Sequence, residues 1–270
     1  MSFYFAKPSI DLSPFVKQYW GLENCLNPGE KHVQRIVPNG LMELTFYLGD
    51  RPNLINHQQE ALERTVLSGH CNNHHDLVVT GNLQMFSVSF KPLGAAMFFN
   101  LPMNELFGCI VPARFLLKES IDRLETSLSG TPDFKNKVRL VEESLMNQLT
   151  QKGNVPDHKR LEESIKLINK NRGMVEVDVL ASSACWSRKQ YERNFQEIIG
   201  TSPKQFMRIV RFQHAIHYKG LYPNAQLTGL AYECGFFDQS HMINEFKTFS
   251  GLTPRQYFAD CEPVSDYFSD

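Results

Sequence analysis

A repeat of about 50 residues in the second half of the chain limits the possible folds more than any other feature. Leu180-Ala181 recurs as Leu230-Ala231, at an offset of 50 residues. Four later positions recur at an offset of 51, where Phe195, Gly200, Pro203 and Phe206 correspond to Phe246, Gly251, Pro254 and Tyr257. The extra residue falls in a turn, where Trp186 faces Phe236-Phe237. Because a repeat of fixed period marks one supersecondary unit, we predict a duplicated helical unit.

The region after residue 156 is predicted to be helical almost to its end. Apolar residues recur there at spacings of three and four, as in Leu161, Ile165 and Ile168. Gly173 closes this first helix, Val179-Leu180-Ala181 begins a second, and Ser187 caps a third that runs to about Ile199. Gly200 ends the third helix, and Ser202-Pro203 begins a fourth.

Each repeat unit is typical of a helix-turn-helix, in which a short helix, a tight turn and a long capped helix follow one another. Gly235 occupies the turn position that favours a left-handed residue, whereas the first copy has Cys185 there, a weaker turn signal. The inward face of each long helix is predicted to hold Tyr191 and Phe195, or Met242 and Phe246. The outward faces are polar: Arg188, Lys189, Glu192, Arg193 and Gln196 in the first, and Gln239, His241, Asn244, Glu245 and Lys247 in the second.

Such outward faces suit reading of the DNA major groove. Arginine bridges guanine O6 and N7, and glutamine or asparagine bridges adenine N6 and N7. The helix N-termini capped by Ser187 and Asp238 are also suited to meeting phosphate. The alternative is plain packing, because every amphipathic helix has a polar face. The duplication and the caps favour DNA binding, although the bulk charge does not, since residues 155–262 hold 14 basic and 12 acidic side chains.

The sequence of residues 230–258, LAYECGFFDQSHMINEFKTFSGLTPRQYF, resembles the C-terminal signature of AraC-type bacterial transcription regulators. WSRKQYERNF and GTSPKQF, within residues 177–206, resemble the first helix-turn-helix of that family, and the likeness covers about residues 158–262. The resemblance implies seven helices, with the two helix-turn-helix units joined by a long helix over about residues 203–218. Cys185-Trp186 departs from the usual Gly-aromatic pair of the first turn.

The family's base-reading positions fall on two sets of residues: Lys189, Glu192 and Arg193 in the first unit, and Gln239, Ser240, His241 and Asn244 in the second. By the same resemblance Arg188, Gln190 and Lys247 would meet the DNA backbone. Glu192 is acidic, so it would prefer cytosine N4 and repel phosphate.

Residues 1–150 are predicted to form a β-rich domain with flanking helices. Short β-branched or aromatic runs at residues 32–37, 41–48, 77–80 and 85–90 are bounded by Gly, Pro and Asn. Within one run Glu43, Thr45 and Tyr47 alternate with apolar residues, which predicts a strand with one drier face. Ser13-Pro14 is expected to open a short helix. Apolar spacing predicts two helices, at about residues 121–128 and 138–149.

The predicted fold class is therefore α+β with two domains. Residues 1–150 are the β-rich domain, residues 151–157 a polar linker, and residues 158–262 the all-α domain with two helix-turn-helix units. The N-terminal segment resembles the β-rich domain often fused to AraC-type regulators. That likeness implies a cupin-like barrel that binds a small effector or mediates dimerisation. Candidate effector residues are Tyr19, Trp20, Glu43, Phe46, Tyr47, Phe90 and Phe98, with ordinary core as the simpler interpretation.

Two other kinds of site are compatible with single features of the sequence. The loop over residues 70–76 holds His70, Cys71, His74, His75 and Asp76, but no ligand follows at a typical metal-binding spacing, so a polar loop is favoured over a metal site. A cupin enzyme would need three strand ligands, and only His32 and Glu43 lie on candidate strands. The chain has no nucleophile elbow, P-loop or dinucleotide motif. We therefore expect no enzyme, metal or cofactor.

The composition agrees with a two-domain globular protein. Of 270 residues, 42% are hydrophobic and 21% charged, and the net charge is −1. No run approaches ~18 apolar residues, and no secretory signal is present, so we expect a cytoplasmic protein without membrane contact. The six cysteines form no C-x-x-C pair and are expected to be reduced.

The sequence thus predicts a DNA-binding transcription regulator whose partners are double-stranded DNA, a small effector and RNA polymerase, acting as a homodimer or monomer. Alternatives are an N-terminal domain that only holds protomers together, or a metal-binding or enzymatic cupin with an accessory helical domain. The sequence does not distinguish activation from repression.

Overall fold

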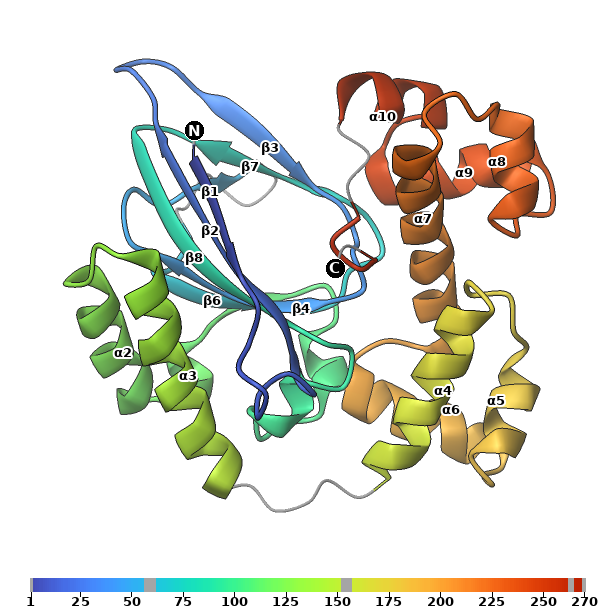
Figure 1. Ribbon diagram of the computed structural model, residues 1–270, viewed down its shortest axis with the longest axis horizontal. Coiled ribbons are helices and arrows are strands. Elements are labelled where there is room, and N and C mark those ends of the chain that lie inside the picture. Colours follow the sequence, from blue (N-terminus) through green and yellow to red (C-terminus); the bar gives the residue numbers. More distant parts are fainter. Residues whose placement is uncertain (1, 56–61, 152–156, 262–264, 269–270) are drawn as a thin grey trace. The chain divides into compact units, whose positions relative to one another are not determined.

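Two sheets organise the first part of the chain and seven helices the second (Figure 1). The computed structural model describes residues 2–55, 62–151, 157–261 and 265–268. It divides into two units. The N-terminal unit comprises Met1–Arg35, Leu41–Gly69 and His75–Pro156, and the C-terminal unit comprises Ile36–Gly40, His70–His74 and Asp157–Asp270. Most of the predicted linker, residues 152–156, lies outside the described residues.

The larger sheet of the N-terminal unit has six antiparallel strands in the order β1-β2-β8-β4-β6-β9. Their bounds are β1 Ser2–Ala6, β2 Val16–Cys25, β4 Met42–Tyr47, β6 Thr65–Ser68, β8 Asn82–Phe90 and β9 Ile110–Pro112. The smaller sheet has the order β3-β7-β5, with bounds β3 His32–Ile36, β5 Asn53–Leu54 and β7 His75–Val79. An ion pair of 2.8 Å between Arg35 on β3 and Asp76 on β7 links two of its strands. The predicted β-rich N-terminal domain is confirmed.

The strand at residues 42–47 has the predicted drier face, formed by Met42, Leu44 and Phe46, but its second face is also largely buried. Phe46 is fully buried, but Thr45 and Tyr47, on the opposite face of β4, are each only 5% exposed. The Thr45 and Ser87 hydroxyls form a hydrogen bond of 2.9 Å there. A polar residue in this pattern is thus buried with a partner rather than exposed to water.

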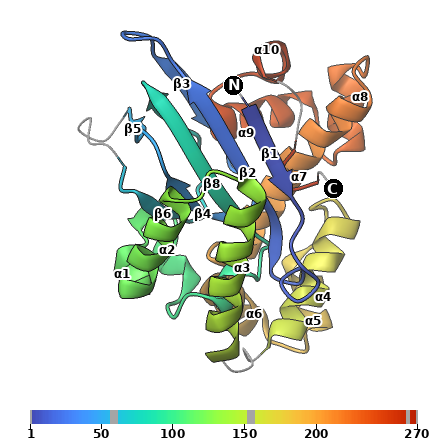
Figure 2. The ribbon, with the colours of Figure 1, turned by 60° about the vertical axis from the view of Figure 1, so that its left-hand side comes forward.

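Helices cover one side of the larger sheet. These are α1 Arg114–Leu117, α2 Glu119–Ser129 and α3 Phe134–Gln151, preceded by the 3-10 turns η1 Ala95–Met97 and η2 Met103–Leu106. Figure 2 shows α2 and α3 side by side next to the strands. Phe134 of α3 packs against Phe86 with ring centroids 5.4 Å apart, and a Cβ at Gly21 would come within 3.0 Å of the Phe134 ring. The two predicted helices are confirmed.

One predicted helix is absent from the structure. Residues 10–15 form turns, and β2 begins at Val16. The Ser13 hydroxyl donates to the Ile10 carbonyl at 2.9 Å instead of accepting from a following amide, so Ser13 does not act as a helix cap. The prediction that Ser13-Pro14 opens a helix is wrong, because the chain there turns into a long strand.

The described part of the C-terminal unit contains seven helices, as the family resemblance implies. Their bounds are α4 His158–Lys170, α5 Val177–Ser183, α6 Arg188–Ile199, α7 Pro203–Leu221, α8 Leu227–Glu233, α9 Gln239–Ser250 and α10 Pro254–Asp260. The long helix α7 contacts α4 and α6 on one side of the repeat and α8 and α9 on the other. Among the helices that the structure describes, none is both long enough and apolar enough to cross a membrane.

Candidate nucleic-acid interface

The two repeat units have the same turn in the backbone. The amides of Trp186 and Phe236 donate to the carbonyls of Ala181 and Ala231, at 3.0 and 2.9 Å. The turn residue is left-handed in both copies, with φ of 56° at Cys185 and 73° at Gly235. The first turn therefore keeps its geometry although a non-glycine residue occupies the left-handed position, and both units are helix-turn-helix motifs.

The caps and ends of the two long helices are as predicted. The Ser187 hydroxyl accepts from the Gln190 amide at 3.3 Å, and the Asp238 carboxylate accepts from the His241 amide at 2.6 Å. Each helix ends at a left-handed glycine, Gly200 or Gly251. These caps fix the N-termini of α6 and α9, where a major-groove helix presents its first residues.

The inward faces of α6 and α9 are confirmed. Tyr191 and Phe195 in α6, and Met242 and Phe246 in α9, are fully buried. The Phe246 ring lies against Phe212 of α7, with centroids 4.9 Å apart. The outward faces are thereby determined by helix geometry, since residues three and four apart share a side.

An arginine of helix α7 links the second motif to the segment between α4 and α5. Nη2 of Arg211 donates to the Gly173 carbonyl at 3.4 Å, and its Nη1 donates to the Gly235 carbonyl at 3.3 Å. Gly173 lies between α4 and α5 and Gly235 lies in the second turn, so Arg211 links the second motif to the segment that precedes the first. Burial lowers the pKa of Arg211 from its usual range, while the charge of Glu245 opposes that shift.

The prediction that Glu245 lies on the outward face of α9 is wrong. Its side chain is only 10% exposed and accepts from Nε and Nη2 of Arg208 on α7, with a shortest contact of 2.8 Å. The Arg208 guanidinium also stacks over the Phe249 ring at 5.2 Å. Glu245 therefore positions α9 on α7 and is not available to DNA.

The outward face of α6 is partly occupied by its own ion pairs. Arg188 donates to Glu192 at 3.1 Å and to Asp178 at 3.0 Å. The carboxylates of Glu192 and Asp178 raise the pKa of Arg188. Glu192 is thus neutralised by Arg188, which reduces the repulsion of phosphate expected of this acid. Lys189, Gln190 and Arg193 are exposed.

On α9 two of the predicted base-reading side chains already have partners. The Thr228 hydroxyl donates to Oε1 of Gln239 at 3.0 Å. The His241 ring accepts from the Phe237 amide at 3.2 Å, and its Nε2 lies 3.9 Å from Glu245. Ser240, Asn244 and Lys247 are exposed. Gln239 would have to release the Thr228 hydroxyl to present its whole amide to a base edge, whereas His241 can keep the Phe237 amide at Nδ1 and still offer Nε2.

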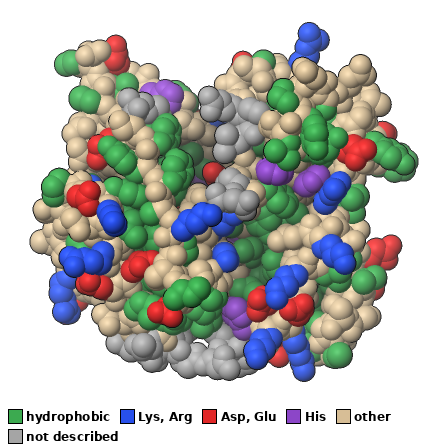
Figure 3. Space-filling model, in the orientation of Figure 1, with side chains coloured by type: hydrophobic (Ala, Val, Ile, Leu, Met, Phe, Trp, Pro, Cys, Tyr) green, Lys and Arg blue, Asp and Glu red, His purple; other side chains and the backbone are tan. Residues whose placement is uncertain are grey.

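The charge on the surface is mixed in sign. Figure 3 shows basic and acidic side chains interspersed over α4, α5 and α6 on the face in view, and no single basic patch covers them. DNA binding by this unit would thus depend on the placement of individual residues rather than on net charge.

The histidine-rich loop does not gather metal ligands. His70 is 3% exposed and meets the Phe206 ring edge-on, with centroids 6.2 Å apart. Burial lowers the pKa of His70 to about 4, partly opposed by a hydrogen bond to the backbone of Ile199. Within the ranges that the structure describes, no group of three or more His, Cys, Asp or Glu side chains is placed to hold a metal ion. His70 serves the core of the C-terminal unit.

The seven candidate effector residues lie mostly in the core of the N-terminal unit. Tyr19, Phe46 and Phe90 are fully buried, Tyr47 and Phe98 nearly so, and Trp20 and Glu43 are half-buried. Glu43 accepts from the Ser89 hydroxyl at 2.8 Å. These aromatic side chains are packed on the two faces of the larger sheet, as expected of ordinary core residues.

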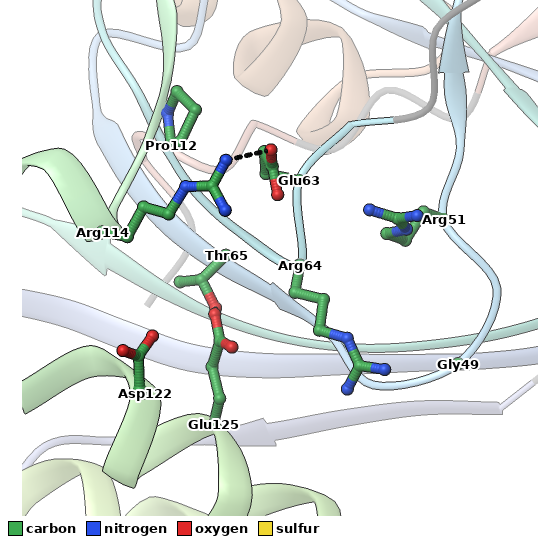
Figure 4. A pocket seen from close by; sticks show the side chains of 9 residues that line it. All are labelled: Gly49, Arg51, Glu63, Arg64, Thr65, Pro112, Arg114, Asp122 and Glu125. Carbon is green, nitrogen blue, oxygen red and sulfur yellow. Dashed lines mark hydrogen bonds and ion pairs between the residues drawn. The ribbon is translucent and has the colours of Figure 1, made fainter. Parts of the chain in front are cut away.

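A cavity of about 300 Å³ lies elsewhere in this unit, lined by residues of β6, β9, α1 and α2 and of the segments that follow β4 and precede β6 (Figure 4). Its lining is charged: Gly49, Arg51, Glu63, Arg64, Thr65, Pro112, Arg114, Asp122 and Glu125. Arg114 pairs with Glu63 at 2.7 Å, and the Thr65 hydroxyl donates to Glu125 at 2.5 Å. None of the seven candidate effector residues lines this cavity. Sequence reasoning missed it because its charged residues are scattered over 75 positions of the chain, from Arg51 to Glu125.

Comparison with known proteins assigns the two parts of the chain separately. Residues 180–260 match the family described as "Helix-turn-helix domain", and residues 4–112 match a "Domain of unknown function (DUF6597)". The chain is 26% identical over 100 residues to the HTH-type transcriptional regulator ArgR of Pseudomonas aeruginosa, covering 37% of this chain and 30% of that protein. It is 35% identical over 81 residues to an uncharacterized HTH-type transcriptional regulator of Haemophilus influenzae, covering 30% of this chain and 27% of that protein.

These matches span less than a third of each curated relative. Among solved structures, that of ToxT from Vibrio cholerae is similar in fold, with a TM-score of 0.50 at 11% identity, covering 85% of this chain and 97% of the other. The likeness extends over both units and concerns the fold alone.

Proposed function

The C-terminal part of this chain is an AraC-type helix-turn-helix domain, and from this premise we propose that the protein is a transcription regulator that binds double-stranded DNA. The observation that carries the proposal is the pair of capped helices α6 and α9, each following the same turn and each with a polar outward face. In this proposal the protein binds ligands and does not act as an enzyme. We place the protein in the cytoplasm, because the bacterial chromosome is located there.

We infer that α6 and α9 enter successive major grooves. In α6, Lys189 and Arg193 read bases, because both are exposed and no ion pair holds either one within the described residues. Glu192 forms an ion pair with Arg188. In the complex Glu192 accepts from cytosine N4, and Arg188 contacts the DNA backbone beside it. In α9, Ser240 and Asn244 read bases, and Gln239 joins them after releasing Thr228. His241 reads a base through Nε2 while its Nδ1 keeps the Phe237 amide. Gln190 and Lys247 meet phosphates.

The test is selection of a binding site from a randomised duplex pool with the purified full chain, followed by titration of the selected duplex. Substituting Arg193→Ala should weaken binding by about 5- to 150-fold, the equivalent of ~1–3 kcal/mol, and relax preference at one base pair. Arg139→Ala is the matched control, because Arg139 is an exposed arginine of α3 in the other unit. Absence of any sequence preference in a folded wild-type protein at low salt would refute the proposal.

We propose further that the N-terminal unit binds a small charged effector in the cavity of Figure 4. Arg51 and Arg64 supply guanidinium groups for a carboxylate or phosphate, while Asp122 and Glu125 on α2 supply acceptors for an ammonium or hydroxyl group. Such an effector would regulate DNA binding only by having different affinity for two states of the protein.

Melting of the full chain in a panel of small dipolar and anionic metabolites tests this effector site. A ligand at 100 times its Kd should stabilise the wild type by ~2.7 kcal/mol, and Arg64→Ala should abolish the shift. Arg123→Ala, an exposed arginine of α2 outside the cavity, is the control. If no compound shifts the melting temperature, the alternative gains support, in which this unit only holds protomers together.

A further inference from the structure

The one-residue difference between the two repeats has a structural origin at Phe237. Trp186 in the first turn and Phe236 in the second are equivalent, since both amides close the turn and both rings are buried, at 9% and 5% exposure. The caps Ser187 and Asp238 are also equivalent. Phe237 therefore has no counterpart in the first repeat, and it is the residue that changes the offset from 50 to 51.

The side chain of this inserted residue is an aromatic ring that is exposed to solvent. Phe237 is 91% exposed, whereas the other phenylalanines of the second motif, Phe236, Phe246 and Phe249, are buried. Single exposed apolar residues are common on proteins, so exposure alone carries little. A second observation is the position of Phe237 in the chain. It directly precedes Asp238, the N-cap of α9, and α9 is a helix that reads DNA in the proposed function.

The backbone of Phe237 is held in place. Its amide donates to Nδ1 of His241 at 3.2 Å, while the Asp238 carboxylate accepts from the His241 amide at 2.6 Å. The residue is thus tied to the first turn of α9, next to Gln239 and Ser240. A side chain on a fixed backbone loses less entropy on contact than one on a loose loop.

We propose that Phe237 is a specificity-determining residue that packs its ring on the 5-methyl group of a thymine at the edge of the site read by α9. Apolar contact with that methyl is a recognised form of major-groove readout, and phenylalanine is among the side chains that make it. The inference rests on the proposed DNA-binding function. It adds an apolar contact to a face that is otherwise made of polar and charged side chains.

The experiment uses the full chain and the duplex selected by the wild type, with each thymine replaced in turn by deoxyuridine, which lacks only the methyl group. One replacement should weaken wild-type binding by about 4-fold, the equivalent of one buried methyl group. Phe237→Ala should weaken binding to the unmodified duplex by at least that factor and should be insensitive to the same replacement. Phe237→Leu should retain part of the methyl preference.

The outcomes separate this inference from the proposed function. If the wild type selects a sequence but Phe237→Ala binds it with the same affinity and the same deoxyuridine profile, the role of Phe237 is refuted and the DNA-binding function stands. A uniform loss that ignores the methyl groups also refutes it, because the ring would then contact sugar or phosphate. If the wild type selects no sequence, the proposed function itself fails.

Discussion

The substitution of Phe246 by alanine tests the packing of the second helix-turn-helix against α7. The ring is fully buried, with centroids 4.9 Å from Phe212, 5.7 Å from Tyr257 and 5.4 Å from Phe258. Removing a buried phenylalanine costs ~3–5 kcal/mol of unfolding free energy. We expect a value in the upper half of that range, because each aromatic pair contributes ~0.5–1.5 kcal/mol beyond its buried area.

Urea unfolding of the full chain, followed by far-ultraviolet circular dichroism, measures the loss. Phe237→Ala is the matched control, since it is the same substitution nine residues earlier at a ring that is 91% exposed. It should change the unfolding free energy by less than ~0.5 kcal/mol. Equal losses for the two variants, or a loss below ~1 kcal/mol for Phe246→Ala, would show that the inward face of α9 is wrongly assigned.

Three further substitutions test other parts of the C-terminal unit. Gly173→Ala should destabilise the protein by ~1–3 kcal/mol in urea unfolding, because φ at Gly173 is +76° and the new Cβ would lie 2.4 Å from the Met207 carbonyl oxygen. The control is Gly229→Ala in α8, where a Cβ meets no atom within 4 Å, and this variant should be as stable as the wild type or more stable. Burial lowers the pKa of the His70 imidazole to about 4 in the folded protein, from 6.5 in the unfolded chain. As the pH falls, the unfolded chain therefore binds the proton before the folded protein does. The unfolding free energy should therefore fall by up to roughly 3 kcal/mol from pH 7 to pH 4. In the His70→Gln variant the unfolding free energy should change less steeply with pH. Equal pH dependence in the wild type and the variant would contradict the burial of His70. Glu245→Ala should cost ~1–3 kcal/mol, less than a fully buried pair because the Arg208 side chain is 31% exposed, while Glu197→Ala, at an exposed position, should cost little.

The features that the sequence predicted correctly are those determined by neighbouring residues. The caps at Ser187 and Asp238 depend on a side chain and an amide three positions later, and the stops at Gly200 and Gly251 depend on backbone conformation at one residue. The inward faces of α6 and α9 follow from helical periodicity. The repeat added a second copy of each signal, which is why two motifs were predictable from residues 158–262, while the count of seven helices came from the family resemblance.

The features that it missed depend on residues far apart in the chain. Strand β1 pairs with residues of β2 that lie 13 to 21 positions away, and its pattern alone carries no sign of a strand partner. Glu245 lies beside Phe246 at the border of the polar face, and only Arg208, 37 residues earlier on α7, draws it inward. The same holds for the charged cavity, whose residues come from α2 and from the segments around β4, β6 and β9.

The amino-acid sequence by itself therefore determined what kind of protein this is: a tandem helix-turn-helix preceded by a β-rich domain. Local backbone preferences and periodicity encode those elements, and they hold wherever the elements later pack. Only the tertiary structure decided which polar side chains are left for a ligand. Arg188 and Gln239 have partners on other helices, whereas Arg193, Asn244 and Phe237 point into solvent. Ion pairing, hydrogen bonding and burial between distant residues make that choice, and no local pattern contains it.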